Sequence, residues 1–145
     1  MQTLSKQQMN RSKPEQLIVD FQNCPVQASL GILGRKWALL ILRNIGLYRA
    51  RRFCEMLRVT PGLTRRVLSI RLKELEEEGF IKSVERGSAY SVWDLTDKGR
   101  DALPVLMALV QFGSKWYAER VFSDKIPRAL NEVFVESYIT EIMGR

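Results

Sequence analysis

The sequence predicts a mainly α fold with a small β-hairpin, and three observations support this expectation. Leucines recur at helical spacing in the segment 65–78, and an almost wholly apolar stretch of helical length runs from 37 to 47. The turn-forming segment 86–89 separates two segments of strand-like composition. The chain has 145 residues, of which 46% are hydrophobic and 27% charged, enough apolar side chains for one folded core.

The first third of the chain is expected to be helical. Pro14 to Phe21 predicts a short helix, because proline suits the first helical turn. Pro25 opens a second helix with apolar residues at helical spacing, and Gly34 ends it. The segment 37–47 is apolar almost all round, which is typical of a central buried helix.

Two helices joined by a tight turn are predicted next. A short helix occupies 53–58, and 60–62 are turn residues (Thr-Pro-Gly). Thr64 is expected to cap a strong helix over 65–78, which Gly79 ends.

The remaining elements are two strands and two longer helices. Segments 81–85 and 90–95 are expected to pair as a hairpin. A helix then runs over 97–121, with a kink or a late start predicted at Pro104, and 128–143 is a further amphipathic helix. This order of elements is that of a winged helix-turn-helix.

The positive charge of the chain is concentrated in the segment 49–73. The whole chain has a net charge of +7 and a pI of about 9.7. The segment has eight basic residues and one acidic residue, Glu55, so it alone accounts for the net charge. Charge that serves only solubility is the alternative, but it would be spread over the chain. Binding to nucleic-acid phosphates explains the concentration.

The helix 65–78 has an outer face suited to DNA. If its leucines face the core, Arg66, Ile70 and Lys73 point outward. Arg66 suits a guanine edge, and Ile70 suits a thymine methyl group or, alternatively, packs against the turn. The candidate DNA-contacting residues are Arg51, Arg52, Thr64, Arg65, Arg66, Ser69, Ile70, Lys73 and, at the hairpin tip, Arg86.

Arg71 lies nearer the core face of this helix, and we expect it to pair with a carboxylate. Glutamates crowd the end of the helix from Glu74 to Glu78, so contact with DNA is expected to finish near Lys73.

Several function classes are disfavoured by composition. The chain has no histidine, which removes histidine-based catalysis and the commonest transition-metal ligand. Its two cysteines make a poor zinc site and fit a reducing cytoplasm. No enzyme activity, cofactor or metal is expected. The start of the chain has no apolar signal-peptide core. The longest charge-free stretch of the C-terminal half, Ala102 to Ser114, is too short to span a membrane as a helix, so we expect a cytoplasmic protein without a membrane partner.

Six motifs in order resemble those of the HxlR-type family of winged-helix regulators, which are relatives of the MarR type. The matching segments are Cys24-Pro25-Val26, 34–42, 52–56, 61–76 with Gly79, 95–99 and 103–106. The match runs from Cys24 to about Trp116. The chain differs from the family in a shorter wing tip and in a longer segment after Trp116, which we expect to extend the dimer interface.

The resemblance implies a homodimer on a palindromic operator, with one recognition helix in each half-site. It also implies dimerisation through helices outside the helix-turn-helix. The candidate interface residues are Leu17, Phe21, Leu106, Leu109, Val110, Phe112 and Trp116, although some of them could instead belong to the core of one chain. We therefore expect an N-terminal arm or helix (1–23), a DNA-binding domain (24–96) and C-terminal dimerisation helices (97–145).

Some members of the family sense oxidants through a cysteine at the position of Cys24. Here Cys24 precedes a helix, whose N-terminus can lower the pKa of a thiol. The alternative is a small residue packed at the helix start. Cys54 lies at a variable position and is expected to be structural. A small-molecule or redox effector is thus one expected partner class, beside double-stranded DNA and a second copy of the chain.

Other functions remain open at this stage. A sequence-independent architectural DNA-binding protein needs the same basic surface but no base contacts. A protein-interaction module that has lost DNA binding would not need the arginines of the helix 65–78.

Overall fold

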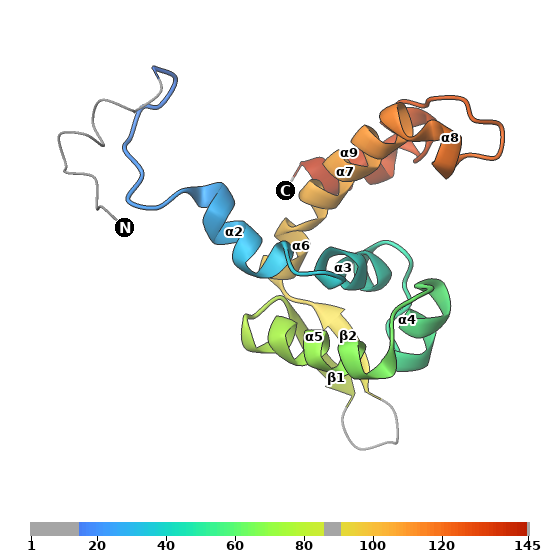
Figure 1. The fold of residues 1–145 in the computed structure, drawn as a ribbon. Coiled ribbons are helices and arrows are strands. Elements are labelled where there is room, and N and C mark those ends of the chain that lie inside the picture. Colours follow the sequence, from blue (N-terminus) through green and yellow to red (C-terminus); the bar gives the residue numbers. More distant parts are fainter. Residues whose placement is uncertain (1–14, 86–90, 145) are drawn as a thin grey trace. The chain divides into compact units, whose positions relative to one another are not determined.

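The computed structural model describes residues 15–85 and 91–144. The chain forms two compact units, 1–31 and 32–145. Figure 1 shows that the described part is mainly helical with one antiparallel hairpin. This confirms the predicted fold class.

The described part of the first unit contains turns and the start of helix α2 (Pro25–Leu33). The helix predicted over 14–21 is wrong, because residues 15–24 form turns and bends, and Pro14 lies outside the described residues. Ile18 is 95% exposed, so nothing packs on it. A segment of eight residues without a packing partner is too short to offset the cost of helix nucleation.

The second unit begins with the predicted helix-turn-helix and hairpin. The helices of this first part are α3 (Ala38–Gly46), α4 (Phe53–Val59) and α5 (Arg65–Glu77). Strands β1 (Ile81–Glu85) and β2 (Val92–Leu95) pair antiparallel, with Ile81 opposite Leu95. We call these two strands the wing and α5 the recognition helix. Arg52, just before α4, forms an isolated bridge with Val92 and adds a short third edge to the wing.

The core lies where α3, α5 and α7 meet behind the wing. Ile41, Leu42 and Ile45 of α3 are buried, which confirms α3 as the predicted central helix. The leucines of α5 are buried with them, as its spacing predicted: Leu68, Leu72 and Leu75. The opposite face of α5 is therefore turned away from the core.

The helix predicted over 97–121 is divided into three: α6 (Asp97–Asp101), α7 (Leu103–Trp116) and α8 (Ala118–Val121). Pro104 lies in the first turn of α7. Of the two expected alternatives, a kink or a late helix start at Pro104, the structure therefore shows the helix start. The next break is at Tyr117, whose backbone leaves the helical region (φ −118°, ψ 25°).

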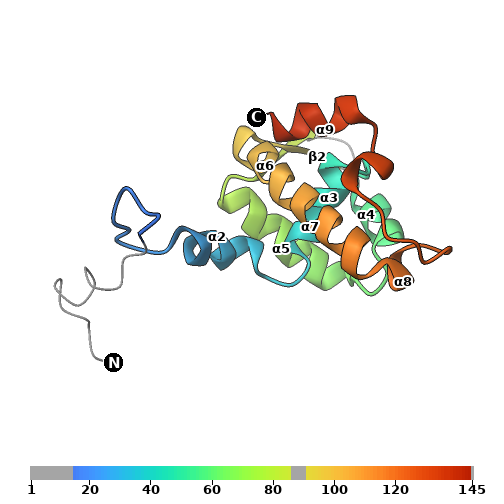
Figure 2. The same ribbon diagram turned by 90° about the horizontal axis from the view of Figure 1, so that it is seen from above.

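The helix predicted over 128–143 is only partly correct. The structure has one turn of 3-10 helix, η1 (Leu130–Glu132), and then α9 (Glu136–Met143). Val135 between them is extended, and β-branched residues lose side-chain freedom in a helix. Helix α9 lies beside α7, and its Ile142 is buried in the core (Figure 2).

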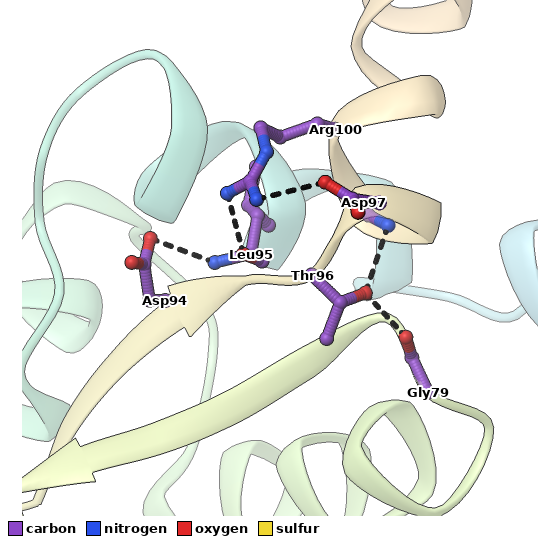
Figure 3. A network of polar contacts seen from close by, with 7 residues as sticks. Gly79, Asp94, Leu95, Thr96, Asp97 and Arg100 are labelled. Atoms are coloured by element: carbon purple, nitrogen blue, oxygen red, sulfur yellow. Dashed lines mark hydrogen bonds and ion pairs between the residues drawn. The ribbon is translucent and has the colours of Figure 1, made fainter.

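A small polar network joins the end of the recognition helix to the wing and to α6 (Figure 3). Gly79 ends α5 with a positive φ of 79°, and its carbonyl accepts a hydrogen bond from the Thr96 hydroxyl. The same hydroxyl accepts from the Gly99 N–H at 3.2 Å and so caps α6. Arg100 donates to the Leu95 carbonyl at 2.8 Å and pairs with Asp97 at 3.0 Å. The end of α5 and the start of α6 are thereby held together.

Among the described helices, none is long and apolar enough to cross a membrane.

Candidate nucleic-acid interface

The turn before the recognition helix is fixed from both ends. The Val67 N–H donates to the Thr64 hydroxyl at 3.2 Å, so Thr64 caps α5 as predicted. Gly62 has a φ of +91°, a conformation that favours glycine, and a Cβ there would lie 3.3 Å from the Trp37 ring. The intervening residue, Leu63, is buried. The start of α5 therefore has one defined direction.

The outer face of α5 carries exposed side chains of the predicted kinds. Arg66, Ser69 and Lys73 are exposed. Ile70 is 43% exposed, which does not favour the alternative that it packs against the turn. An exposed isoleucine between cations suits contact with a thymine methyl group.

Two further predicted cations flank this face. Arg65, at the first turn of α5, places its guanidinium 6.0 Å from the centre of the Phe53 ring. Arg52 is exposed just before α4. Its backbone N–H donates to the Glu55 carboxylate at 3.1 Å, and its carbonyl accepts the Met56 N–H at 3.0 Å. Within residues 15–85 and 91–144, neither guanidinium forms an ion pair. As far as the described residues show, both guanidinium groups are available to contact phosphate.

Arg51 has a different environment from the other predicted contact residues. Its Nε donates to the Trp93 carbonyl at 3.0 Å, and its guanidinium lies 3.6 Å from the Asp94 carboxylate. Trp93 also donates its N–H to the Arg51 carbonyl at 3.0 Å. Arg51 therefore ties the start of α4 to β2, and we leave it out of the contact set proposed below.

Arg71 supports the recognition helix from behind. Its Nη1 lies 3.1 Å from the Glu74 carboxylate, which confirms the predicted pairing, and its Nε donates to the Lys36 carbonyl at 2.9 Å. Arg35 holds the other oxygen of Glu74 at 3.0 Å. Desolvation opposes ionisation of Glu74, but the hydrogen bonds and charges of Arg35 and Arg71 prevail and lower the pKa of this carboxyl.

A buried polar network that the sequence did not predict positions the turn. Asn44 of α3 is fully buried, and its amide nitrogen donates to the Thr60 hydroxyl at 2.7 Å. Arg43 donates to the Asn44 side-chain oxygen at 2.8 Å, and the Ala50 N–H donates to the Asn44 carbonyl at 2.8 Å. The only signal in the sequence is one asparagine within an apolar helix. Its partner lies sixteen residues away, so no local pattern reveals the contact.

Comparison with known proteins identifies the architecture. A family model described as the HxlR-like helix-turn-helix matches residues 32–121, more than half of the chain. The protein belongs to the HxlR-like helix-turn-helix family. This confirms the resemblance noted in the sequence and makes the chain a transcriptional regulator, not an enzyme.

Individual relatives agree with this assignment. The HTH-type transcriptional regulator YdeP of Bacillus subtilis is 36% identical over 115 residues, which cover 76% of this chain and 84% of that protein. The solved structure of PA1607 is 36% identical, with a TM-score of 0.59, and the match covers 66% of this chain and 67% of that one. A structure from Thermoplasma volcanium whose description names the HxlR family is 30% identical, with a TM-score of 0.54, and covers 63% and 84% of the two chains.

The candidate dimer residues of this HxlR-like chain differ in whether the single chain buries or exposes them. Leu106 is 5% exposed and belongs to the core of the single chain, so its prediction as an interface residue is corrected. Leu109, Phe112 and Trp116 are exposed on α7, and Val110 is half-buried. The remaining two candidates, Leu17 and Phe21, belong to the first unit.

The remaining predicted site residues are Arg86 and the two cysteines. Arg86, which the sequence predicts at the hairpin tip, lies outside the described residues. Cys24 is exposed just before α2, and its carbonyl accepts the Ala28 N–H at 2.9 Å. Cys54 is also exposed. Groups of His, Cys, Asp and Glu that could hold a metal ion do not occur among the residues that the structure describes.

Proposed function

We propose that this HxlR-like regulator binds a palindromic operator as a homodimer, with the recognition helix of each copy in the major groove. The observation that carries the proposal is the outer face of α5, where Arg66, Ser69, Ile70 and Lys73 are exposed while its leucines are buried. These are side chains that read base edges and contact phosphates. The N-terminus of α5 adds backbone N–H groups that favour an adjacent phosphate.

The proposed contact set follows from this geometry. Arg66 and Ile70 contact bases, because they lie in the first half of the helix that enters the groove. Phosphate contacts come from Arg52, Thr64, Arg65, Ser69 and Lys73. Arg86, in the wing tip at 86–89, contacts the backbone or the minor groove.

A dimer through α7 is supported by its exposed apolar side chains. Leu109 and Phe112 are three residues apart, Phe112 and Trp116 four, so they share one side of the helix. Each is more than half exposed in the single chain, and Trp116 reaches 66%. Covering them with a second copy removes apolar surface from water. The interface of the proposal is thus α7, and Leu17 and Phe21 of the first unit are proposed as separate contacts with the second copy.

The experiment that tests base reading compares two duplexes at one salt concentration. We expect the purified protein to bind its operator about a thousandfold or more tighter than a random duplex of equal length. Comparable affinity for both would favour the sequence-independent architectural protein. No measurable affinity for either would favour an interaction module.

A redox role for Cys24 is a second proposal, supported by the exposure of its thiol at the start of α2. Oxidation there would alter the conformation of the N-terminal segment and thereby the affinity for DNA.

A further inference from the structure

A groove opens beside the recognition helix, between α4, the flank of α5 and β2. Its volume is about 630 Å³. Pockets that bind small molecules usually have volumes of roughly 300–1,000 Å³. The groove includes Arg52, Phe53 and Arg58 from the α4 side, Ser69 and Lys73 from α5, and Trp93 from β2.

The cations of this groove are not neutralised by described neighbours. Arg52, Arg58 and Lys73 are exposed, and none forms an ion pair within residues 15–85 and 91–144. Two carboxylates, Glu55 and Glu76, also line the groove.

Glu55 is already committed to the start of α4. Its carboxylate accepts the backbone N–H groups of Arg51 and Arg52 at 3.0 and 3.1 Å. Among the described lining residues, three cations therefore stand against two carboxylates, Glu55 and Glu76, and this excess of positive charge favours an anion.

Part of the remaining described lining is apolar and aromatic. Phe53 and Trp93 are half-buried, and Leu72 lies between the helices in the core. Aromatic and aliphatic surface beside guanidinium groups is the environment of a flat apolar ligand with a negative group. A phosphodiester backbone would use the cations but would not need this apolar surface.

We propose that the groove binds a small aromatic anion, such as a carboxylate or sulfonate, and that this ligand competes with DNA. This inference rests on the proposed function, because Arg52, Ser69 and Lys73 belong both to the groove and to the proposed DNA contacts. Ligand and DNA would claim the same side chains, so each excludes the other. The apparent affinity for the operator then falls as the concentration of the anion rises above its dissociation constant.

The test uses the full-length protein and two naphthalene probes of similar size. We expect 2-naphthalenesulfonate to bind in calorimetry and the uncharged 2-naphthalenemethanol to bind at least roughly tenfold more weakly. Arg58→Ala should weaken sulfonate binding by roughly tenfold, and Arg58→Lys should restore part of it. Arg120→Ala on α8, an exposed cation outside the groove, is the matched control.

The two exposed cysteines provide a second readout of location. Cys54 lines the groove and Cys24 does not. In single-thiol chains made with Cys24→Ser or Cys54→Ser, the sulfonate should slow alkylation of Cys54 by iodoacetamide and leave Cys24 unchanged. Added operator DNA should release the sulfonate.

Three results would overturn the inference. Equal binding of the two probes, or of the sulfonate to Arg58→Ala and the unchanged protein, would show that no anion site exists. Protection of Cys54 by duplex DNA but not by the sulfonate would assign the groove to the DNA backbone and leave the proposed function intact. A sulfonate that protects Cys54 without displacing operator DNA would refute the competition.

Discussion

Arg66 is the residue on which base reading depends most directly. It is exposed in the first turn of α5, and a bidentate contact with a guanine edge carries information that a phosphate contact lacks. We predict that Arg66→Ala weakens operator binding by about 1–3 kcal/mol and relaxes the preference at one base position. Titrations against a set of single-base operator variants measure this. A loss of the same size on every sequence would show that Arg66 touches only phosphate, and Arg120→Ala is the control.

Cys24 is the residue that a redox response would require. Its thiol is exposed at the start of α2. We predict that diamide changes the operator affinity of the unchanged protein and of Cys54→Ser, but not that of Cys24→Ser. Fluorescence anisotropy with labelled operator gives the three affinities. An equal response in all three chains removes Cys24 from the mechanism.

For single residues, the sequence predicted which helix face a side chain occupies better than it predicted which residues that side chain contacts. The spacing of leucines in α5 predicted which of its residues are exposed, because a helix repeats every 3.6 residues. The engagement of Arg51 by Trp93 and the contact of Asn44 with Thr60 were not predictable. Both join residues that only the folded chain brings together.

The packing of α6 against the end of α5 determines how the wing meets the recognition helix. A Cβ on Gly99 would lie 2.1 Å from the Phe80 carbonyl oxygen, which is backbone and cannot move aside alone. We predict that Gly99→Ala lowers the free energy of unfolding by about 1–3 kcal/mol in urea titrations.

Gly31→Ala is the matched control for this prediction. Gly31 lies within α2, and a Cβ there would meet nothing within 4 Å. Alanine has the higher helix propensity, so the change should be neutral or stabilising by up to about 1 kcal/mol. A Gly99→Ala protein as stable as the Gly31→Ala protein would mean that α6 tolerates a displacement from Phe80 and would contradict the prediction.

The short elements bounded by turn or capping residues were predicted from sequence, and the two long predicted helices were not. Helices α2, α3, α4 and α5 and strand β1 follow the predicted segments closely, and β2 begins at Val92, inside its segment. The segment 128–143 differs from its predicted single helix because its apolar residues pack on the core through a 3-10 turn and a short helix. Spacing alone does not distinguish that path from one continuous helix.

The assembly of the whole molecule depends on the exposed face of α7. We predict that Phe112→Glu shifts the protein from dimer to monomer, because it places a charge in the apolar surface that a second copy would cover. Sedimentation over a range of concentrations gives the dissociation constant. Val84→Glu, at an exposed position of the wing, is the control for added charge. A monomer–dimer equilibrium that Phe112→Glu leaves unchanged would exclude α7 from the interface.

The segment after Trp116 shows why assembly was harder to predict than the fold. The sequence suggested that this extra length extends a dimer interface. In the structure Ile142 is buried in the core of its own chain, and the Tyr138 hydroxyl donates to the Gly46 carbonyl at 3.4 Å. An amphipathic segment has the same pattern whether its apolar face meets its own chain or a second copy.

The central claim is that two recognition helices read two symmetric half-sites. Footprinting of the purified protein on the DNA that flanks its own gene tests this most directly. We expect two protected major-groove segments related by a two-fold axis, with centres about 10 base pairs or a multiple of that apart. Protection that spreads evenly along the DNA without a boundary, or a single unpaired segment, would contradict the account.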